Sequence, residues 1–212
     1  MPRPSPATDL VLRALSSSYQ RERLVGSSLL LAVSGGADSV ALLVGSAQLA
    51  PALRLRLEVG TLDHGLRPEC GAEVQAVLAL AARLGLPAHA RTLQLPADVP
   101  ALEERARAAR YAALEALRAE RDLARIATGH TASEQAETLL MRLVRGSALK
   151  GARAIHASRG RLVRPLLALP RAALRDFLAE QGVGFHEDPM NADPRFLRAR
   201  LRHAVLPALD AA

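Results

Sequence analysis

The chain has 212 residues, of which 50% are hydrophobic and 23% are charged, a composition typical of a globular protein. Its single cysteine, Cys70, excludes a disulfide framework, a paired-cysteine redox motif and a cysteine-based zinc site. Aromatic residues make up 2%, which argues against nucleic-acid binding by a row of stacked rings. No apolar run approaches the ~20 residues that cross a membrane, and the first ten residues lack the apolar core of a secretion signal. We therefore expect a cytoplasmic protein that does not bind membranes.

The net charge of +7 is distributed unevenly along the chain. Residues 1–141 contain 15 basic and 15 acidic side chains, whereas residues 142–203 contain 13 basic and 5 acidic ones. A basic C-terminal third on a neutral body predicts a polyanionic partner such as nucleic acid. A compositional preference for Ala, Leu and Arg is the simpler alternative, because all but one of the 28 basic residues are arginine.

Strand-like and helix-like segments alternate along the chain. In order, the sequence predicts strand 29–33, helix 38–48, strand 55–62, helix 72–84, strand 89–95, helix 101–120, strand 123–128, helix 132–144, strand 162–169, helix 170–181 and helix 194–206. This alternation predicts an α/β fold in which a parallel twisted sheet carries helices on both faces. We expect residues 1–212 to form one domain, with a basic C-terminal helix in 190–212 that Pro207 stops.

The segment between the first strand and the next helix carries the clearest chemical signal: Ser34, Gly35, Gly36, Ala37, Asp38 and Ser39. Adjacent glycines allow a tight turn close to a ligand, and the free N–H groups at the start of the helix suit phosphate. An aspartate here would repel phosphate unless a divalent cation lay between them, so Asp38 indicates Mg²⁺. The Walker pattern with its lysine is absent, and an ordinary glycine turn capped by Asp and Ser is the structural alternative.

This SGGxDS pattern resembles the pyrophosphate loop (PP-loop) of the ATP pyrophosphatase superfamily, whose fold is of the adenine nucleotide alpha hydrolase type and Rossmann-like. Further segments resemble the tRNA(Ile)-lysidine synthetase family. They are LDHGLR at 62–67, LEERARAARY at 102–111, TGHTASEQAET at 128–138, LVRGS at 143–147, EDPMN at 187–191 and RFLR at 195–198.

Three departures from that family's pattern involve four positions. Ser133 and Glu134 stand where the family usually has two aspartates, Thr131 replaces a histidine, and Ala199 replaces an asparagine. Longer members also carry C-terminal tRNA-binding domains, which we expect this chain to lack.

The resemblance implies an ATP-dependent ligation. The O2 of the wobble cytidine of tRNA(Ile) with a CAU anticodon attacks the α-phosphate of ATP, and pyrophosphate leaves. The ε-amino group of free L-lysine then attacks C2 of the activated base, giving lysidine and AMP. ATP and Mg²⁺ are the implied cofactors. Two alternatives stay open: a tRNA thiolase of the same superfamily, which the lone cysteine disfavours, and a catalytically impaired RNA-binding remnant. The oligomeric state is open, a homodimer included.

Candidate residues follow from the motifs. Residues 34–39 with His64 and His130 are predicted to bind ATP, and Asp38 to hold magnesium. Glu134 and Glu137 lie on one face of a predicted helix, as do Arg107 and Arg110. We assign these four to the lysine substrate, and the α-phosphate of ATP is the alternative partner of the two arginines. The predicted catalytic residues are Asp38, Arg110, Glu134 and Glu137. The predicted tRNA contacts are Arg145, Arg195, Arg198, Arg200 and Arg202.

For each of these sets a structural alternative remains. Glu134 and Glu137 could form an acidic helix start, and Arg107 and Arg110 a surface face paired with Glu103 and Glu104. The C-terminal arginines could form a solvated basic face.

Overall fold

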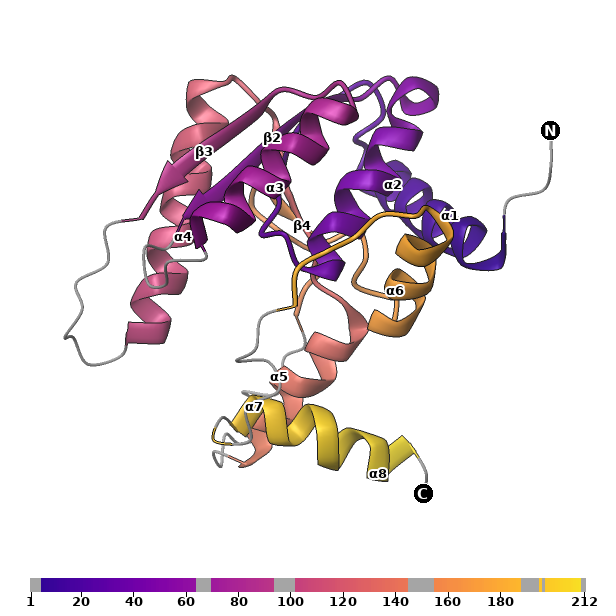
Figure 1. Cartoon of the computed structure of the whole chain (residues 1–212), viewed down its shortest axis with the longest axis vertical. Coiled ribbons are helices and arrows are strands. Elements are labelled where there is room, and N and C mark those ends of the chain that lie inside the picture. The colour runs from indigo at the N-terminus through magenta and orange to yellow at the C-terminus, as the bar shows by residue number, and fades with distance from the viewer. Residues whose placement is uncertain are drawn as a thin grey trace.

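A six-stranded sheet forms the centre of the fold in the computed structural model (Figure 1), which describes residues 5–63, 70–93, 102–144, 155–187, 195 and 197–210. The strand order is β3-β2-β1-β4-β6-β5. In chain order the strands are β1 (Ser28–Ala32), β2 (Arg56–Asp63), β3 (Ala88–Thr92), β4 (Arg125–Thr128), β5 (Ser158–Arg159) and β6 (Leu162–Val163).

Strands β3, β2, β1, β4 and β6 pair in parallel, which confirms the predicted parallel sheet. The edge strand β5 pairs antiparallel with β6 and was not predicted, because two residues are too short for an alternating pattern. The predicted strand 162–169 is wrong beyond Val163: residues 164–169 leave the sheet through turns. Their run of leucines is buried without being extended, a case in which short apolar segments are ambiguous.

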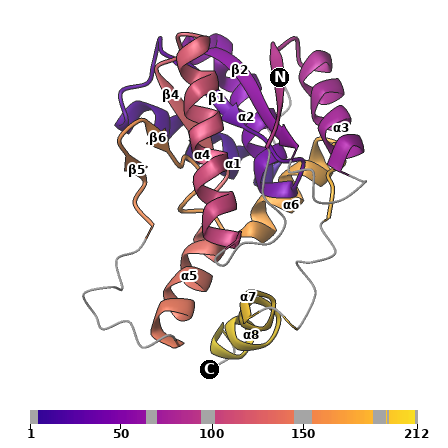
Figure 2. The same cartoon turned by 90° about the vertical axis from the view of Figure 1, so that its left-hand side faces the viewer.

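Helices cover both faces of the sheet, as predicted (Figure 2). On one face lie α2 (Ala37–Leu53) and α3 (Cys70–Arg83), and α1 (Pro6–Arg21) and α6 (Arg171–Glu180) pack beside α2. On the other face lies α4 (Leu102–Glu120), whose leucines pack on β1 and β4.

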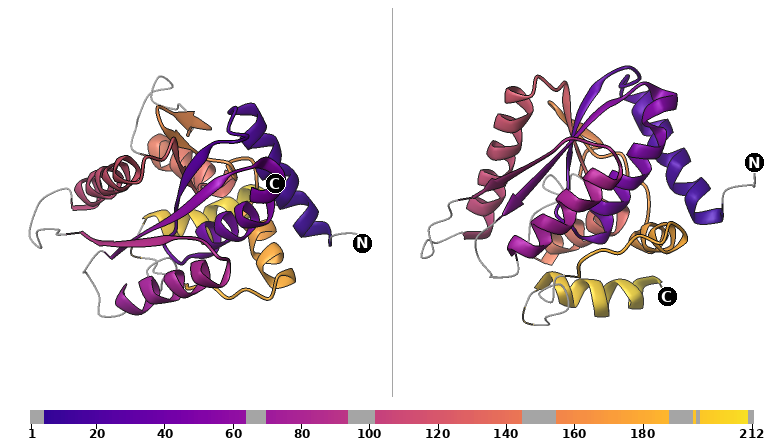
Figure 3. Two further views of the ribbon diagram at one scale, coloured as in Figure 1. Left: turned by 90° about the horizontal axis from the view of Figure 1, so that it is seen from above. Right: turned by 45° about the horizontal axis from the view of Figure 1, so that its top comes forward.

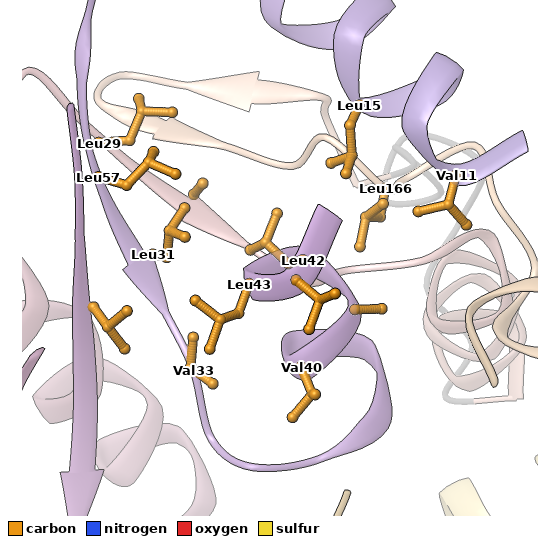
Figure 4. Close-up of a cluster of buried hydrophobic side chains, with 14 of the residues drawn as sticks. Val11, Leu15, Leu29, Leu31, Val33, Val40, Leu42, Leu43, Leu57 and Leu166 are labelled. Atoms are coloured by element: carbon orange, nitrogen blue, oxygen red, sulfur yellow. The ribbon is translucent and has the colours of Figure 1, made fainter. Parts of the chain in front are cut away.

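Alternate residues of β1 supply the two cores. Leu29 and Leu31 are fully buried among the side chains of α1, α2 and the strands (Figure 4). Leu30 points to the opposite face, where it packs against Leu114 and Leu117 of α4. Burial on both faces explains why this strand is a continuous apolar run.

Helix α1 was not among the predicted elements. It starts at Pro6, a residue favoured in the first helical turn, and buries Val11, Leu15 and Tyr19 at helical spacing. Helix α2 is longer than predicted: it runs through Pro51 and ends where Arg54 adopts a left-handed conformation with φ 52°.

The C-terminal helical segment lies beside α5 (Ala132–Val144), below the end of the sheet (Figures 1 and 3). It comprises α7 (Leu197–Arg200), a π-helical turn η3 (Leu201–Val205) and α8 (Leu206–Asp210). The prediction that Pro207 stops the helix is wrong. The π-helical turn bonds the N–H of Leu206 to the carbonyl of Leu201, and this shifted register admits a residue without an N–H.

The topology places a switch point between β1 and β4. The crossovers through α2 and α3 lie on one face and the crossover through α4 lies on the other, so the strand order reverses between these two neighbours. In open α/β sheets, ligands bind at the carboxyl ends of the strands at such a switch point. Asp38 follows β1 and His130 follows β4, so both belong to this edge.

Candidate active site

The loop of residues 34–39 forms a tight hairpin between β1 and α2. Gly35 has φ +89°, a conformation that side chains rarely adopt, and Gly36 is the residue before the first turn of α2. The Ser39 hydroxyl accepts the N–H of Ser34 at 3.1 Å and donates to the Gly36 carbonyl at 2.9 Å. These bonds fold the hairpin back onto the N-terminus of α2.

A later segment of the chain supports this hairpin from outside. The main-chain N–H of His186 donates to the Gly35 carbonyl at 2.9 Å. Gly36 and His186 form an isolated parallel β-bridge between the two segments. The His186 ring lies 2.9 Å from a carboxylate oxygen of Glu73, in the first turn of α3. The hairpin is therefore held between α3 and residues 183–187, a support that was not predicted.

The turn after β4 approaches the start of α2 more closely than any side chain would allow. A Cβ atom built on Gly129 would lie 2.7 Å from the main-chain oxygen of Asp38 and 2.9 Å from the nitrogen of Ser39. Glycine at this position therefore brings His130 and α5 next to Asp38.

Asp38 is the carboxylate within the hairpin, and its side chain is mostly buried. Its Oδ2 accepts a hydrogen bond from Nε of Arg171 at 2.9 Å. Its Oδ1 is buried and has no hydrogen-bond partner among the described residues. Burial raises the pKa of Asp38 above its usual value, and the charge and hydrogen bond of Arg171 oppose that rise.

These features fit a magnesium ion that binds through few protein ligands. Within the described ranges, no group of three or more His, Cys, Asp or Glu side chains is arranged to hold a metal. Magnesium in phosphate sites commonly keeps waters and binds one or two carboxylates together with the substrate phosphates. The free Oδ1 of Asp38 supplies one such oxygen.

Arg171 also connects Asp38 to α5. Its Nη1 lies 3.6 Å from Oε1 of Glu137, and its main-chain N–H donates to the Ser133 hydroxyl at 3.2 Å. Ser133, one of the departures from the family pattern, thus helps to fasten the start of α6 to the start of α5.

Glu137 is fully buried and its two oxygens are held by the C-terminal segment. Arg202 donates to Oε1 at 2.7 Å, and Arg198 donates to Oε2 at 2.6 Å. Arg198 also lies 3.3 Å from Glu134. Burial alone would raise the pKa of Glu137, but the hydrogen bonds from Arg202 and Arg198 hold that pKa below its usual value.

Thr131 and Glu134 form a reciprocal cap at the start of α5. The N–H of Glu134 donates to the Thr131 hydroxyl, and the N–H of Thr131 donates to the Glu134 carboxylate, both at 3.3 Å. Thr131, the second departure from the family pattern, therefore caps the N-terminus of α5 through its hydroxyl. The third departure, Ala199, is buried in α7.

His130 lies at the carboxyl end of β4 in a strongly positive environment. Burial lowers the pKa of His130 to about 3, together with the charges of Arg164, Arg107, Arg198 and Arg110. Its ring is therefore neutral near pH 7, and Nδ1 lies 2.8 Å from the Thr128 hydroxyl. The field of Arg107 and Arg110 reaches this edge from α4.

The structure brings most of the predicted site residues to one edge of the sheet. Residues 34–39, His130, Glu134, Glu137, Arg198 and Arg202 gather there, with Arg107 and Arg110 of α4 near enough to act on His130. Arg195 and Arg200 are exposed. His64 and Arg145 lie outside the described residues.

In the structure, Arg198 pairs with Glu134 and Glu137, and Arg202 pairs with Glu137. We predicted these two arginines as tRNA contacts and the two glutamates as lysine contacts. Two arginines were missed: Arg171, and Arg164, which is 7% exposed and donates to the His156 carbonyl. Arg171 lies 133 residues along the chain from Asp38, so no local pattern marked it. Arg164 lies eight residues from His156 and belongs to none of the motifs identified in the sequence.

The family comparison agrees with this geometry. The PP-loop domain family matches residues 11–209, nearly the whole chain. The chain belongs to this family. The predicted superfamily is thereby confirmed, and the hairpin of residues 34–39 is referred to below as the PP-loop.

Curated relatives carry the name tRNA(Ile)-lysidine synthase. The protein from Methylobacterium nodulans is 49% identical over 185 residues, which cover 85% of this chain and 54% of that protein. The one from Rhodopseudomonas palustris is 46% identical over 192 residues, covering 87% and 55%. The one from Thermobifida fusca is 38% identical over 207 residues, covering 98% and 64%. The chain thus spans just over half to about two thirds of the length of these relatives, and the predicted resemblance to lysidine synthetases is confirmed.

Solved structures support the fold. A U34-tRNA thiolase from Methanococcus maripaludis superposes with a TM-score of 0.76 at 15% identity, covering 97% of this chain and 73% of that one. An NH3-dependent NAD synthetase from Campylobacter jejuni superposes with a TM-score of 0.54 at 15% identity, covering 96% and 83%. At these identities the likeness shows a shared fold alone. No helix in the described part of the chain is both long and apolar enough to span a membrane.

Proposed function

We propose that this chain is the ATP-dependent catalytic part of a tRNA(Ile)-lysidine synthase. In the proposed reaction, O2 of the wobble cytidine of tRNA(Ile) bonds to the α-phosphorus of ATP and the bond to pyrophosphate breaks. The uncharged ε-amine of free L-lysine then bonds to C2 of the base, and AMP leaves. The names of relatives 38–49% identical to this chain support this choice of substrates.

The observation that carries the proposal is the geometry of the PP-loop. Gly35 and Gly36 turn the chain so that the N-terminus of α2 opens at the switch point between β1 and β4. Free N–H groups and the helix dipole favour the negative charge that collects on the departing pyrophosphate. Ser34 and Ser39 are joined to each other at 3.3 Å and keep this hairpin in shape.

Mg²⁺ would bind at Asp38 and, when bound, would neutralise part of the phosphate charge. Oδ1 of Asp38 is the oxygen that remains for it. Oδ2 is already held by Arg171, so the carboxylate is fixed in orientation before any ligand arrives.

The second half-reaction needs carboxylates that attract the lysine ammonium ion. We assign this task to Glu134 and Glu137, one turn apart on α5, with Arg107 or Arg110 of α4 for the lysine carboxylate. Arg198 and Arg202 occupy both carboxylate oxygens of Glu137 in the structure. The lysine ammonium group would therefore reach Glu137 only by displacing one of the two guanidinium groups. The neutral His130 can accept or donate a single hydrogen bond at the free side of its ring.

For tRNA, the exposed guanidiniums of Arg195 and Arg200 are the proposed phosphate contacts, with Arg145 as a further candidate. We place the protein in the cytoplasm, where its proposed tRNA substrate would be found. A homodimer is compatible with this assignment, which does not require one.

Two observations favour the alternative of an RNA-binding remnant. Both oxygens of Glu137 are occupied by arginines, and Ser133 removes one of the acidic charges typical of the family. The two functions differ in a simple assay. A lysidine synthase releases pyrophosphate from ATP in a manner that depends on tRNA(Ile), and it incorporates labelled lysine into that tRNA.

A remnant would bind tRNA with strong salt dependence and release no pyrophosphate. Asp38→Ala is the matched variant, expected to abolish pyrophosphate release in the synthase. Pyrophosphate release by Asp38→Ala at the unsubstituted rate would contradict the proposed role of Asp38. Sulfur incorporation into tRNA would support the thiolase alternative instead.

A further inference from the structure

Arg171 lies between the two halves of the proposed site, and neither the sequence motifs nor the proposed reaction gives it a task. Its Nε is 2.9 Å from Oδ2 of Asp38, and its Nη1 is 3.6 Å from Oε1 of Glu137. The side chains of Arg171 and Asp38 are 20% and 16% exposed, and that of Glu137 is fully buried. Arg171 therefore contacts both the nucleotide side and the lysine side of the site.

Helix formation does not account for an arginine here. Arg171 is the first residue of α6, and the first turn of that helix contains no acidic residue. A cation at a helix N-terminus opposes the helix dipole and is unfavourable for the helix. The contacts of Arg171 with Asp38 and Glu137 offset this unfavourable effect. They relate the arginine to the site and not to the stability of the helix.

We propose that Arg171 is a positioning residue that fixes the Asp38 carboxylate for the cation bound with ATP. Because a carboxylate is planar and both its oxygens turn together about the Cβ–Cγ bond, holding Oδ2 in place also fixes Oδ1. Oδ1 is the buried oxygen without a partner among the described residues. The inference rests on the proposed function, since it presumes that ATP and a divalent cation bind at the PP-loop.

The anchor of Arg171 is itself fixed by the fold. Its main-chain N–H is bonded to Ser133 on α5, and α6 packs against α1 and α2. The guanidinium therefore reaches Asp38 from a helix that lies beside the one carrying Asp38. Groups that orient a metal-binding carboxylate in this way commonly change metal affinity about 10–100-fold when they are removed.

A competing arrangement has the opposite consequence. If Arg171 only occupied the place of the cation, its removal would free Asp38 and lower the magnesium concentration needed for nucleotide binding. If Arg171 positions Asp38, its removal raises that concentration. The sign of the change therefore distinguishes the two.

The test is calorimetric titration of an ATP analogue that cannot be cleaved between the α- and β-phosphates, over a series of Mg²⁺ concentrations. For Arg171→Gln we expect affinity in saturating magnesium to fall about tenfold and the half-saturating magnesium concentration to rise, with little change in metal-free binding. Arg171→Lys, which keeps the charge but not the two-sided reach, is expected to be intermediate.

Arg13→Gln is the control, because Arg13 lies on α1 and pairs with Asp9 of the same helix, with 78% of its side chain exposed. It is expected to bind like the unsubstituted chain. An unchanged or lowered magnesium requirement in Arg171→Gln overturns the inference. Should that variant not fold, Arg171→Lys decides by the same criterion. Failure of the unsubstituted chain to bind the analogue contradicts the proposed function instead, whatever the variants do.

Discussion

Gly129 offers a sharp test of how the site is assembled. Its replacement by alanine would place a Cβ atom 2.7 Å from the main-chain oxygen of Asp38, whereas ordinary van der Waals contact begins at 3.4 Å. The nearest atoms all belong to the backbone of Asp38 and Ser39, so no flexible side chain can relieve the clash. The turn after β4 and the first turn of α2 must separate by about 0.7 Å, the difference between these two distances.

Two effects follow from that separation. Insertion of one methyl group into a tight contact typically costs about 1–3 kcal/mol of unfolding free energy. Displacement of reacting groups by about 1 Å can reduce turnover about 100-fold. We therefore expect Gly129→Ala to lower the free energy of unfolding by about 1–3 kcal/mol and to reduce pyrophosphate release by about ten- to 100-fold at saturating ATP.

Gly71→Ala is the control, since a Cβ on Gly71 of α3 meets nothing within 4 Å. That variant should be neutral or stabilised by up to about 1 kcal/mol, because alanine is the better helix former. Urea unfolding measures the stability, and a pyrophosphate-release assay measures the activity. The reasoning is refuted if Gly129→Ala matches Gly71→Ala in both measurements.

Two further predictions concern stability. Burial acts to raise the pKa of Glu58, but hydrogen bonds from Arg121, Arg56 and His89 outweigh burial and hold the pKa at about 2. The stabilising contribution of Glu58 is therefore present above about pH 4.5 and is lost as the pH falls toward 2. Glu58→Gln should therefore cost about 1–3 kcal/mol in urea unfolding at pH 7, less than the shift alone implies because the arginines are exposed, and the difference should shrink by pH 3; a cost that does not change with pH would contradict this. The buried Tyr19 hydroxyl lies 2.6 Å from the Ser46 hydroxyl, so Tyr19→Phe should cost about 1–2 kcal/mol by leaving Ser46 unpaired. An unchanged thermal midpoint would show that Ser46 finds another partner.

Much of the fold could be predicted because its elements are marked locally. The apolar run around Leu31 is buried on both faces, and Gly35 and Gly36 stand where the turn needs them. Each of these signals lies within a few residues of the structure that it specifies. The true end of β6 depends on pairing with the distant strand β4, and β5 and β6 are two-residue strands that carry no readable period.

In the candidate site, too, residues in local motifs could be predicted and long-range contacts could not. Asp38 and the PP-loop could be found from a contiguous motif. The pairing of Arg198 and Arg202 with Glu137 could not, because more than 60 residues separate the partners. Arg171 lies 133 residues from Asp38 along the chain. Charge patterning indicated a basic C-terminal third, but it did not indicate that two of its arginines turn inward.

The central claim is that the PP-loop holds the pyrophosphate half of ATP. A crystal structure of the chain with Mg²⁺ and the ATP analogue that cannot be cleaved between its α- and β-phosphates tests it directly. We predict the β- and γ-phosphates against the main-chain N–H groups at the start of α2, with the metal ion at Oδ1 of Asp38. Nucleotide bound at any other part of the sheet edge would contradict the claim, as would phosphates that do not touch the PP-loop.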